Sequence, residues 1–148
     1  MSEERYTISS LLSRLVEIEE KVKQFYDSLK TDNNAMLREN FSHFSKEHEE
    51  IARKIETTKR ETIVEFTLEP ISGVNIDKCL GEIEGMVLNR EMKILDKSIK
   101  IEEKISQLYT DVIGKIAHMS GEASQLLLSS NKKAKKRLDV LKQLQKGL

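Results

Sequence analysis

Apolar residues recur along this chain at the three- and four-residue spacing of amphipathic helices. A first stretch begins after Ser9 or Ser10, either of which can serve as the N-cap, and carries Leu11, Leu15, Ile18, Val22, Phe25 and Leu29. The sequence KTDNN then supplies turn residues. A second stretch places Phe41, Phe44, Ile51 and Ile55 on one face, with His48 in the gap between them. This pattern predicts a helical hairpin over residues 8–60.

The pattern changes after Arg60. The sequence TIVEFTLEPISGVN is rich in β-branched residues and contains the only proline, Pro70, with Gly73 just beyond it. Such a segment favours an extended conformation with room for a short strand, and it is too long for a tight turn. We therefore predict a crossover over residues 61–76.

Helical spacing returns at Asn75 or Asp77 and predicts a second hairpin over residues 77–148. Its first helix carries Leu80, Val87, Ile94, Ile101, Ile105, Leu108 and Val112. Gly81 and Gly85 leave open that the first turns form a separate short helix. Ser120 is a candidate cap for the last helix, whose apolar positions are Leu127, Ala134, Leu138 and Leu141. The sequence thus predicts an all-α fold, a four-helix bundle in a single domain spanning residues 1–148.

The two hairpins share a sequence phrase. IEEKVKQFYDSL, which starts at Ile18, recurs as IEEKISQLYTDV, which starts at Ile101, an offset of 83 residues. Without a gap, the same offset aligns the second helix of each hairpin, pairing Phe44 with Leu127, Ile51 with Ala134 and Ile55 with Leu138. We interpret the phrase as an internal repeat produced by duplication of a hairpin.

Composition narrows the class of protein. Lys plus Arg and Asp plus Glu number 25 each, which gives no global charge to attract nucleic acid or a membrane surface. The acidic N-terminus lacks the pattern of a secretory signal, and no apolar run approaches the roughly 20 residues of a membrane span. We expect a cytoplasmic protein without membrane contact.

Cys79 is the only cysteine, so no internal disulfide can form, and we expect it to be a half-buried apolar residue.

The order of hairpin, long crossover and related hairpin, with Glu19 ahead of Phe25-Tyr26 and Glu102 ahead of Leu108-Tyr109, resembles the ferritin-like superfamily and within it the rubrerythrin-type proteins. The resemblance covers Ile8 to about Leu144. It implies a di-iron centre held by one Glu from each of two helices and a Glu-x-x-His pair from each of the other two. Glu19 and Glu102 match the two lone Glu positions.

The two Glu-x-x-His pairs are not matched. Their positions are held by His48 and Ile51 on the second helix and by Asn131 and Ala134 on the fourth. A shifted alignment offers Glu47 and Glu50, but Glu50 then points away from the apolar stripe. We therefore expect no working di-iron oxidase or peroxidase. The sequence contains no Gly-rich phosphate loop and no HExxH motif, so we assign no catalytic residues and lean against an enzyme.

Glu19, His48, Glu102 and Asn131 come one from each predicted helix and fall at about the same height, which would make them a polar layer. Three interpretations stay open. The layer could bind one Fe, Mn or Zn ion through Glu19, His48 and Glu102, with Asn131 or water completing the shell. It could be a hydrogen-bonded network with His48 between the two glutamates and no metal. The glutamates could also flank the core and reach solvent. Tyr26 and Tyr109 are expected to be core or boundary residues.

Positive charge concentrates on the predicted last helix, at Lys132, Lys133, Lys135, Lys136 and Arg137. Such a helix could bind nucleic acid or another polyanion. Alternatively, these basic side chains could pair with the acidic sequences EHEE and IEE of neighbouring helices. Because no aromatic residues are interleaved to stack on bases, the second interpretation is favoured. His43 and His118 are expected at the surface.

The function we expect from the sequence is that of a non-enzymatic, ferritin-like bundle that has lost its di-iron site. It would act as a structural or interaction module with a protein partner or as a homodimer, and most simply without a cofactor. One alternative is a single-metal protein with a metal-handling or oxidative-stress role. The other is a polyanion-binding protein that uses the basic fourth helix.

Overall fold

The computed structural model describes residues 5–29, 34–62 and 68–147, and these ranges contain five helices. Four are long, namely α1 (Ile8–Ser28), α2 (Ala35–Thr62), α4 (Ile94–Ile116) and α5 (Gly121–Gly147), and α3 (Ile76–Leu88) is shorter. The described residues form no strand, so the predicted all-α class is confirmed. None of their helices is long and apolar enough to cross a membrane.

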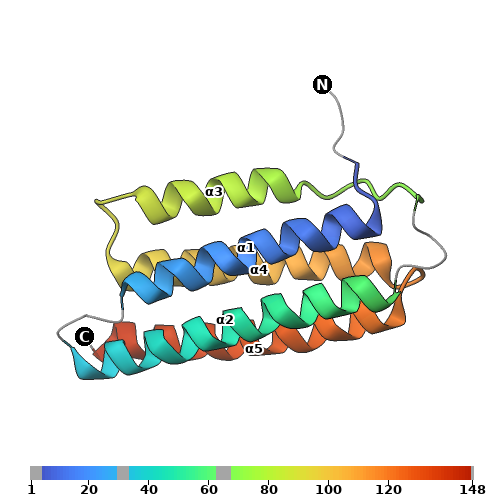
Figure 1. Cartoon of the computed structure of the whole chain (residues 1–148). Coiled ribbons are helices and arrows are strands. Elements are labelled where there is room, and N and C mark those ends of the chain that lie inside the picture. The colour runs from blue at the N-terminus through green and yellow to red at the C-terminus, as the bar shows by residue number, and fades with distance from the viewer. Residues whose placement is uncertain (1–4, 30–33, 63–67, 148) are drawn as a thin grey trace.

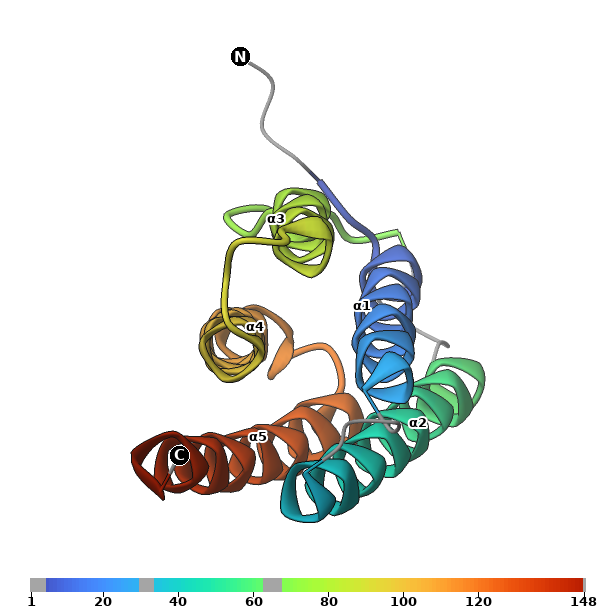
Figure 2. The same ribbon diagram turned by 90° about the vertical axis from the view of Figure 1, so that its left-hand side faces the viewer.

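The four long helices lie side by side (Figure 1). Helix α1 packs on α2, α4 packs on α5, and α2 also packs on α5. Helix α3 contacts both α1 and α4, on the side of the molecule away from α2 and α5 (Figure 2). The interior between the long helices is therefore covered by α3 along the side where α1 and α4 face each other.

Polar side chains fix the starts of several helices. Thr7, and neither Ser9 nor Ser10, is the N-cap of α1: its hydroxyl accepts from Ser10 N at 3.1 Å while Ser10 Oγ accepts from Thr7 N at 2.9 Å. This reciprocal pair is a capping box with Ser in the third helical position. Ser120 caps α5 as predicted, because its hydroxyl accepts from Ala123 N at 3.1 Å.

The segment predicted as one long third helix is divided in two. The break lies between Leu88 and Ile94 and not at Gly81 or Gly85, both of which are inside α3. Asn89 explains its position, because the side-chain oxygen of Asn89 accepts from the backbone of residues 91 and 92 at 2.8 and 3.1 Å. Such a local turn competes with continuation of the helix.

The crossover is tied to the start of the chain. Tyr6 and Ile71 form an isolated antiparallel bridge through two backbone hydrogen bonds of 2.9 and 2.7 Å. The hydroxyl of Tyr6 also accepts from the backbone N of Ile76 at 2.9 Å and of Asp77 at 3.2 Å, at the beginning of α3. The predicted short strand is not formed in the described part of the crossover, while residues 63–67 and most of the KTDNN turn lie outside the described residues.

The predicted apolar stripes of the long helices form the core. Every position predicted for α1, α2 and α5 is buried, except that Leu29, which directly follows α1, is half-buried. The exceptions cluster around α3, where Leu80 and Val87 are half-buried, Ile94 is 37% exposed and the unpredicted Ile83 is fully buried. The break at Asn89 explains this difference, because the residues on either side belong to two helices with separate faces.

Candidate functional site

Six side chains form a buried network between the four long helices. Its members are Glu19 and Tyr26 of α1, His48 of α2, Glu102 and Tyr109 of α4, and Arg137 of α5. Each is at most 2% exposed. Helical spacing places them there: Glu19, for instance, lies four residues after Leu15 and three before Val22, on the apolar face of α1.

His48 lies between the two glutamates. Its Nδ1 is 2.6 Å from Glu19 Oε1, and its Nε2 is 2.9 Å from Glu102 Oε2. Because carboxylate oxygens accept hydrogen bonds, both ring nitrogens donate, which is the pattern of a protonated imidazolium. The imidazole therefore joins α2 to both α1 and α4, and its ring separates the two carboxyl groups.

The two tyrosines bind the glutamates reciprocally. The Tyr26 hydroxyl on α1 donates to Glu102 Oε2 on α4 at 2.6 Å, and the Tyr109 hydroxyl on α4 donates to Glu19 Oε2 on α1 at 2.6 Å. The Tyr26 ring also stacks on the His48 ring, with centroids 5.6 Å apart and planes 21° apart. This reciprocity is the arrangement that a duplicated hairpin would produce.

Arg137 supplies a second buried positive charge. Its Nε donates to Glu102 Oε1 at 3.0 Å, and its Nη1 donates to Glu47 Oε1 at 2.8 Å. Its Nη2 has no hydrogen-bond partner among the described residues. Arg137 therefore connects α5 to α4 and α2, and Glu102 receives a cation on each of its two oxygens.

The charges of the network change its acid–base behaviour. Burial alone would lower the pKa of His48, but Glu102 and Glu19 outweigh it and raise this pKa to about 9. Burial alone would raise the pKa of Glu102, but Arg137 and His48 lower it to about 2. Burial and the adjacent carboxyl groups raise the pKa of Tyr26 and of Tyr109 well above the usual value. At neutral pH His48 and Arg137 are thus positive, Glu102 is negative and both tyrosines keep their protons.

These residues do not fit the ligand set of a di-iron centre. Both nitrogens of His48 and all four carboxyl oxygens of Glu19 and Glu102 already bind protein side chains. In the described ranges no group of three or more His, Cys, Asp or Glu side chains is arranged to hold a metal ion. The reason lies in the geometry, because ligands must converge on one point and the imidazole holds its two carboxyl neighbours on opposite edges.

The structure brings together three of the four residues of the predicted polar layer, Glu19, His48 and Glu102. Asn131 of α5 does not join them and binds side chains of α4 instead. Its Oδ1 accepts from Ser106 Oγ at 2.7 Å, and its Nδ2 donates to Thr110 Oγ1 at 3.1 Å. The interpretation in which the glutamates reach solvent is wrong, because both are fully buried. His48 does lie between them, as the network interpretation required.

Arg137 was one of five basic residues offered as an alternative polyanion-binding surface, and its side chain is only 2% exposed. It lies three residues after Ala134 and four before Leu141, so helical spacing alone could have placed it on the buried face of α5. Its partners belong to the EHEE and IEE sequences, as the pairing interpretation expected. Lys132, Lys135 and Lys136 are exposed. His43 and His118 lie at the surface as predicted, with side chains 65% and 60% exposed.

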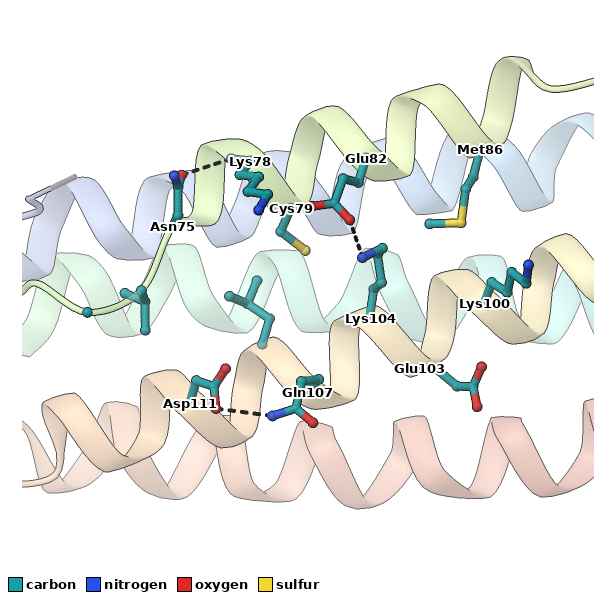
Figure 3. Close-up of a pocket in the computed structure, with 13 residues that line it drawn as sticks. Asn75, Lys78, Cys79, Glu82, Met86, Lys100, Glu103, Lys104, Gln107 and Asp111 are labelled. Atoms are coloured by element: carbon teal, nitrogen blue, oxygen red, sulfur yellow. Dashed lines mark hydrogen bonds and ion pairs between the residues drawn. The ribbon is translucent and has the colours of Figure 1, made fainter. Parts of the chain in front are cut away.

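A separate groove of about 600 Å³ lies between α3 and α4 (Figure 3). Its apolar lining includes Cys79 and Met86, and an ion pair between Lys104 and Glu82 joins the two helices there. Cys79 is half-buried as predicted, and burial raises its pKa to about 11, so it is a protonated thiol at neutral pH. The groove is lined by as many lysines as acidic residues, which gives it no preference for a charged ligand.

No protein-family model matches the sequence, and no curated protein matches it. A solved structure does match: a candidate ferritin-like diiron-carboxylate protein from Thermotoga maritima, with a TM-score of 0.76, 14% sequence identity, and coverage of 98% of both chains. The chain has a ferritin-like fold. At this level of identity the match concerns the fold alone, and the resemblance read from the repeated Glu and Tyr positions is confirmed to that extent.

Proposed function

We propose that this protein is a metal-independent, non-enzymatic structural module in which a buried network of side chains takes the place of a di-iron site. The carrying observation is that both oxygens of the Glu102 carboxylate accept hydrogen bonds from protein side chains, namely His48, Arg137 and Tyr26. Two side-chain cations at this level supply the positive charge that a metal centre would otherwise provide.

The contacts of the network support a structural role. Side chains of α1, α2, α4 and α5 are all joined through it, directly or through Glu102. A buried ion-pair network adds little net stability compared with apolar packing, but mispairing it is costly because a buried charge is then left uncompensated. The network would therefore select one register of the four long helices over alternatives.

The same contacts favour a finer description of the fold. We infer that α1, α2, α4 and α5 form a rubrerythrin-type four-helix bundle in one domain over residues 1–148, and that the crossover between its hairpins includes α3. The equal offset of Glu19 from Tyr26 and of Glu102 from Tyr109, with hydrogen bonds that cross between them, supports an internal repeat.

Metal content tests this function directly. Protein produced without a His tag is analysed for Fe, Mn and Zn by elemental analysis, next to a His48→Ala variant whose fold is checked by circular dichroism. We expect neither protein to hold stoichiometric metal and the wild-type melting temperature to be insensitive to chelator. Near-stoichiometric metal that disappears in the variant would contradict the proposal.

That contrary result would support the alternative of one Fe, Mn or Zn ion on Glu19, His48 and Glu102. The observation in its favour is that these three side chains share one fully buried level of the protein. For the three side chains to bind one ion, one ring nitrogen of His48 would have to lose its hydrogen bond to a glutamate. That nitrogen would then have to point toward the metal without its proton. The metal-handling or oxidative-stress role that the sequence resemblance implied would then be the function to test.

An interaction role rests on the surface. Three exposed lysines, Lys132, Lys135 and Lys136, follow one another along α5 with the half-buried Lys133. We favour a protein partner or a second copy of this chain over nucleic acid, because charge is balanced over the whole sequence. Salt-dependent retention on heparin that is lost on changing these lysines to Gln would instead support polyanion binding.

A further inference from the structure

The outer side of α5 carries a row of exposed lysines. Helical spacing returns them to the same side of the helix, and we call this set the basic face: Lys132, Lys135, Lys136, Lys142 and Lys146. Asp139 is the one acidic residue within the row, and no ion pair among the described residues involves any of the five lysines. Leu128, which is 41% exposed, precedes them on the same side. The basic face therefore presents positive charge outward along much of α5.

A groove between α1 and α3 has the opposite charge. Its volume is about 300 Å³, and its charged lining consists of one lysine and three glutamates, namely Lys21, Glu17, Glu20 and Glu84. We call it the acidic groove. Glu17 pairs with Arg14 at 2.9 Å, whereas no ion pair of the described residues involves Glu20 or Glu84. The half-buried Leu80 adds an apolar part to the lining.

The basic face and the acidic groove belong to different sides of the molecule. Helices α3 and α5 lie opposite each other, with the interior between them (Figure 2). One chain therefore cannot place its own basic face on its own acidic groove, and contact between the two requires a second copy. Because acidic and basic residues are equal in number, two copies approach each other without net repulsion.

We propose that the basic face of α5 docks on the acidic groove of a second copy of this chain. This inference rests on the proposed role as an interaction module and names its partner. Lysine side chains suit the groove, because their aliphatic stems can cover Leu80 while the ammonium groups stay beside Glu20 and Glu84. Since the two surfaces differ, the contact is head to tail, and it leaves each chain one surface for a further copy.

Sedimentation of untagged full-length protein at two salt concentrations tests the association. Raising NaCl from about 0.01 M to about 0.15 M shortens the screening length from roughly 30 Å to about 8 Å. We expect the average mass to rise with protein concentration at low salt, and the dissociation constant to be about tenfold or more larger at the higher salt. Protein that stays monomeric at low salt would overturn the inference. Retention of such a monomer on heparin would assign the basic face to polyanions instead.

Paired charge reversal tests which surfaces meet. The basic-face variant combines Lys132→Glu, Lys135→Glu and Lys136→Glu, and the groove variant combines Glu20→Lys and Glu84→Lys. Neither variant should associate alone, because each then carries like charge on both surfaces, whereas their mixture should associate because the reversed surfaces are complementary. Association of either variant alone to the extent of the wild type, or no recovery in the mixture, would contradict the docking.

A matched control separates docking from net charge. Lys78→Glu, Lys100→Glu and Lys115→Glu together make the same change of charge at exposed lysines on or next to the α3–α4 groove. This control should associate more strongly than the basic-face variant, and an equal loss in both would overturn the inference. All the substituted side chains are exposed, so circular dichroism should show an unchanged fold.

The association and the metal-independent function fail separately. Protein that does not associate and holds no metal would overturn the docking and leave that function intact. Stoichiometric metal in a wild type that associates as expected would contradict the function and support the docking.

Discussion

At the scale of single residues, the two tyrosine hydroxyls of the network make the same contact in opposite directions. Tyr26 and Tyr109 are both fully or almost fully buried, and each donates at 2.6 Å to a glutamate on the other helix. Each hydroxyl also supplies one of the donors that hold a carboxyl group in the interior. Neither tyrosine could therefore become Phe without leaving a buried oxygen one donor short.

We predict that Tyr26→Phe and Tyr109→Phe each lower the free energy of unfolding by about 1.5 to 3 kcal/mol, since each removes a buried hydrogen bond to a charged group and keeps the ring. The two losses should be similar and, in the double variant, should not add, because the tyrosines are coupled through Glu19, His48 and Glu102. Urea unfolding measures all three. A full loss from one substitution and none from the other would refute the reciprocity.

The sequence predicted part of this network. Glu19 and Glu102 were found because they hold equivalent positions in the repeated phrase and match the lone Glu positions of the ferritin-like resemblance. His48 was found because it fills a gap in the apolar stripe of the second helix. Arg137 was missed because it stands among exposed lysines, so that composition concealed its helical position. Asn131 follows from the same repeat as His48, yet its short side chain pairs with Ser106 and Thr110. Which polar side chains contact one another depends on their length and rotamer. The spacing of residues along the sequence does not determine either of these.

At the scale of elements, α3 is attached to the rest of the fold by contacts at both ends. The Tyr6 hydroxyl accepts from the first two N–H groups of α3. At the other end Lys97 of α4, only 8% exposed, donates from Nζ to the carbonyl of Val87 at 3.2 Å. Helix ends leave backbone groups without partners, and here side chains of α4 and of the N-terminal segment satisfy some of them.

We predict that Tyr6→Phe loosens the start of α3 selectively. The substitution keeps the buried ring but removes the acceptor for Ile76 and Asp77, at a cost of about 1 kcal/mol, comparable with the loss of a helix cap. Hydrogen exchange should speed up at these two amides and remain unchanged at Ala123, where the Ser120 cap is untouched. Equal acceleration at both helix starts would indicate global destabilisation and contradict this assignment.

The elements themselves were largely predictable, and the exceptions have local causes. Long amphipathic stretches gave α1, α2, α5 and the C-terminal end of α4 within a few residues, because a repeated apolar face must be buried. The break between α3 and α4 was placed wrongly because Val87 and Ile94 are seven residues apart, a spacing that fits one continuous helix. The Asn89 side chain ends the helix through two local hydrogen bonds, which a search for apolar spacing does not detect.

At the scale of the whole molecule, the network connects protonation to folding. His48 gains two carboxyl partners only when the four long helices are assembled, so its pKa is about 9 in the folded protein against 6.5 for an ordinary histidine. Glu102 changes in the opposite direction, from 4.5 to about 2. The folded state therefore retains the proton of His48 to higher pH than the unfolded chain does, and loses that of Glu102 at lower pH.

These pKa shifts predict that the free energy of unfolding decreases both at high pH and at low pH. The contribution of His48 is fully present below about pH 6.5 and is lost as pH rises through about 9, while that of Glu102 is present above about pH 4.5 and is lost as pH falls through about 2. Between pH 6.5 and 9 the free energy of unfolding should decline by about 3 kcal/mol, the equivalent of the His48 shift. Urea unfolding across this interval measures the decline. His48→Gln should be less stable at pH 6 but should lack the decline, because its amide does not titrate. If the variant lost as much unfolding free energy over this interval as the wild type, another group would control the loss of stability at high pH.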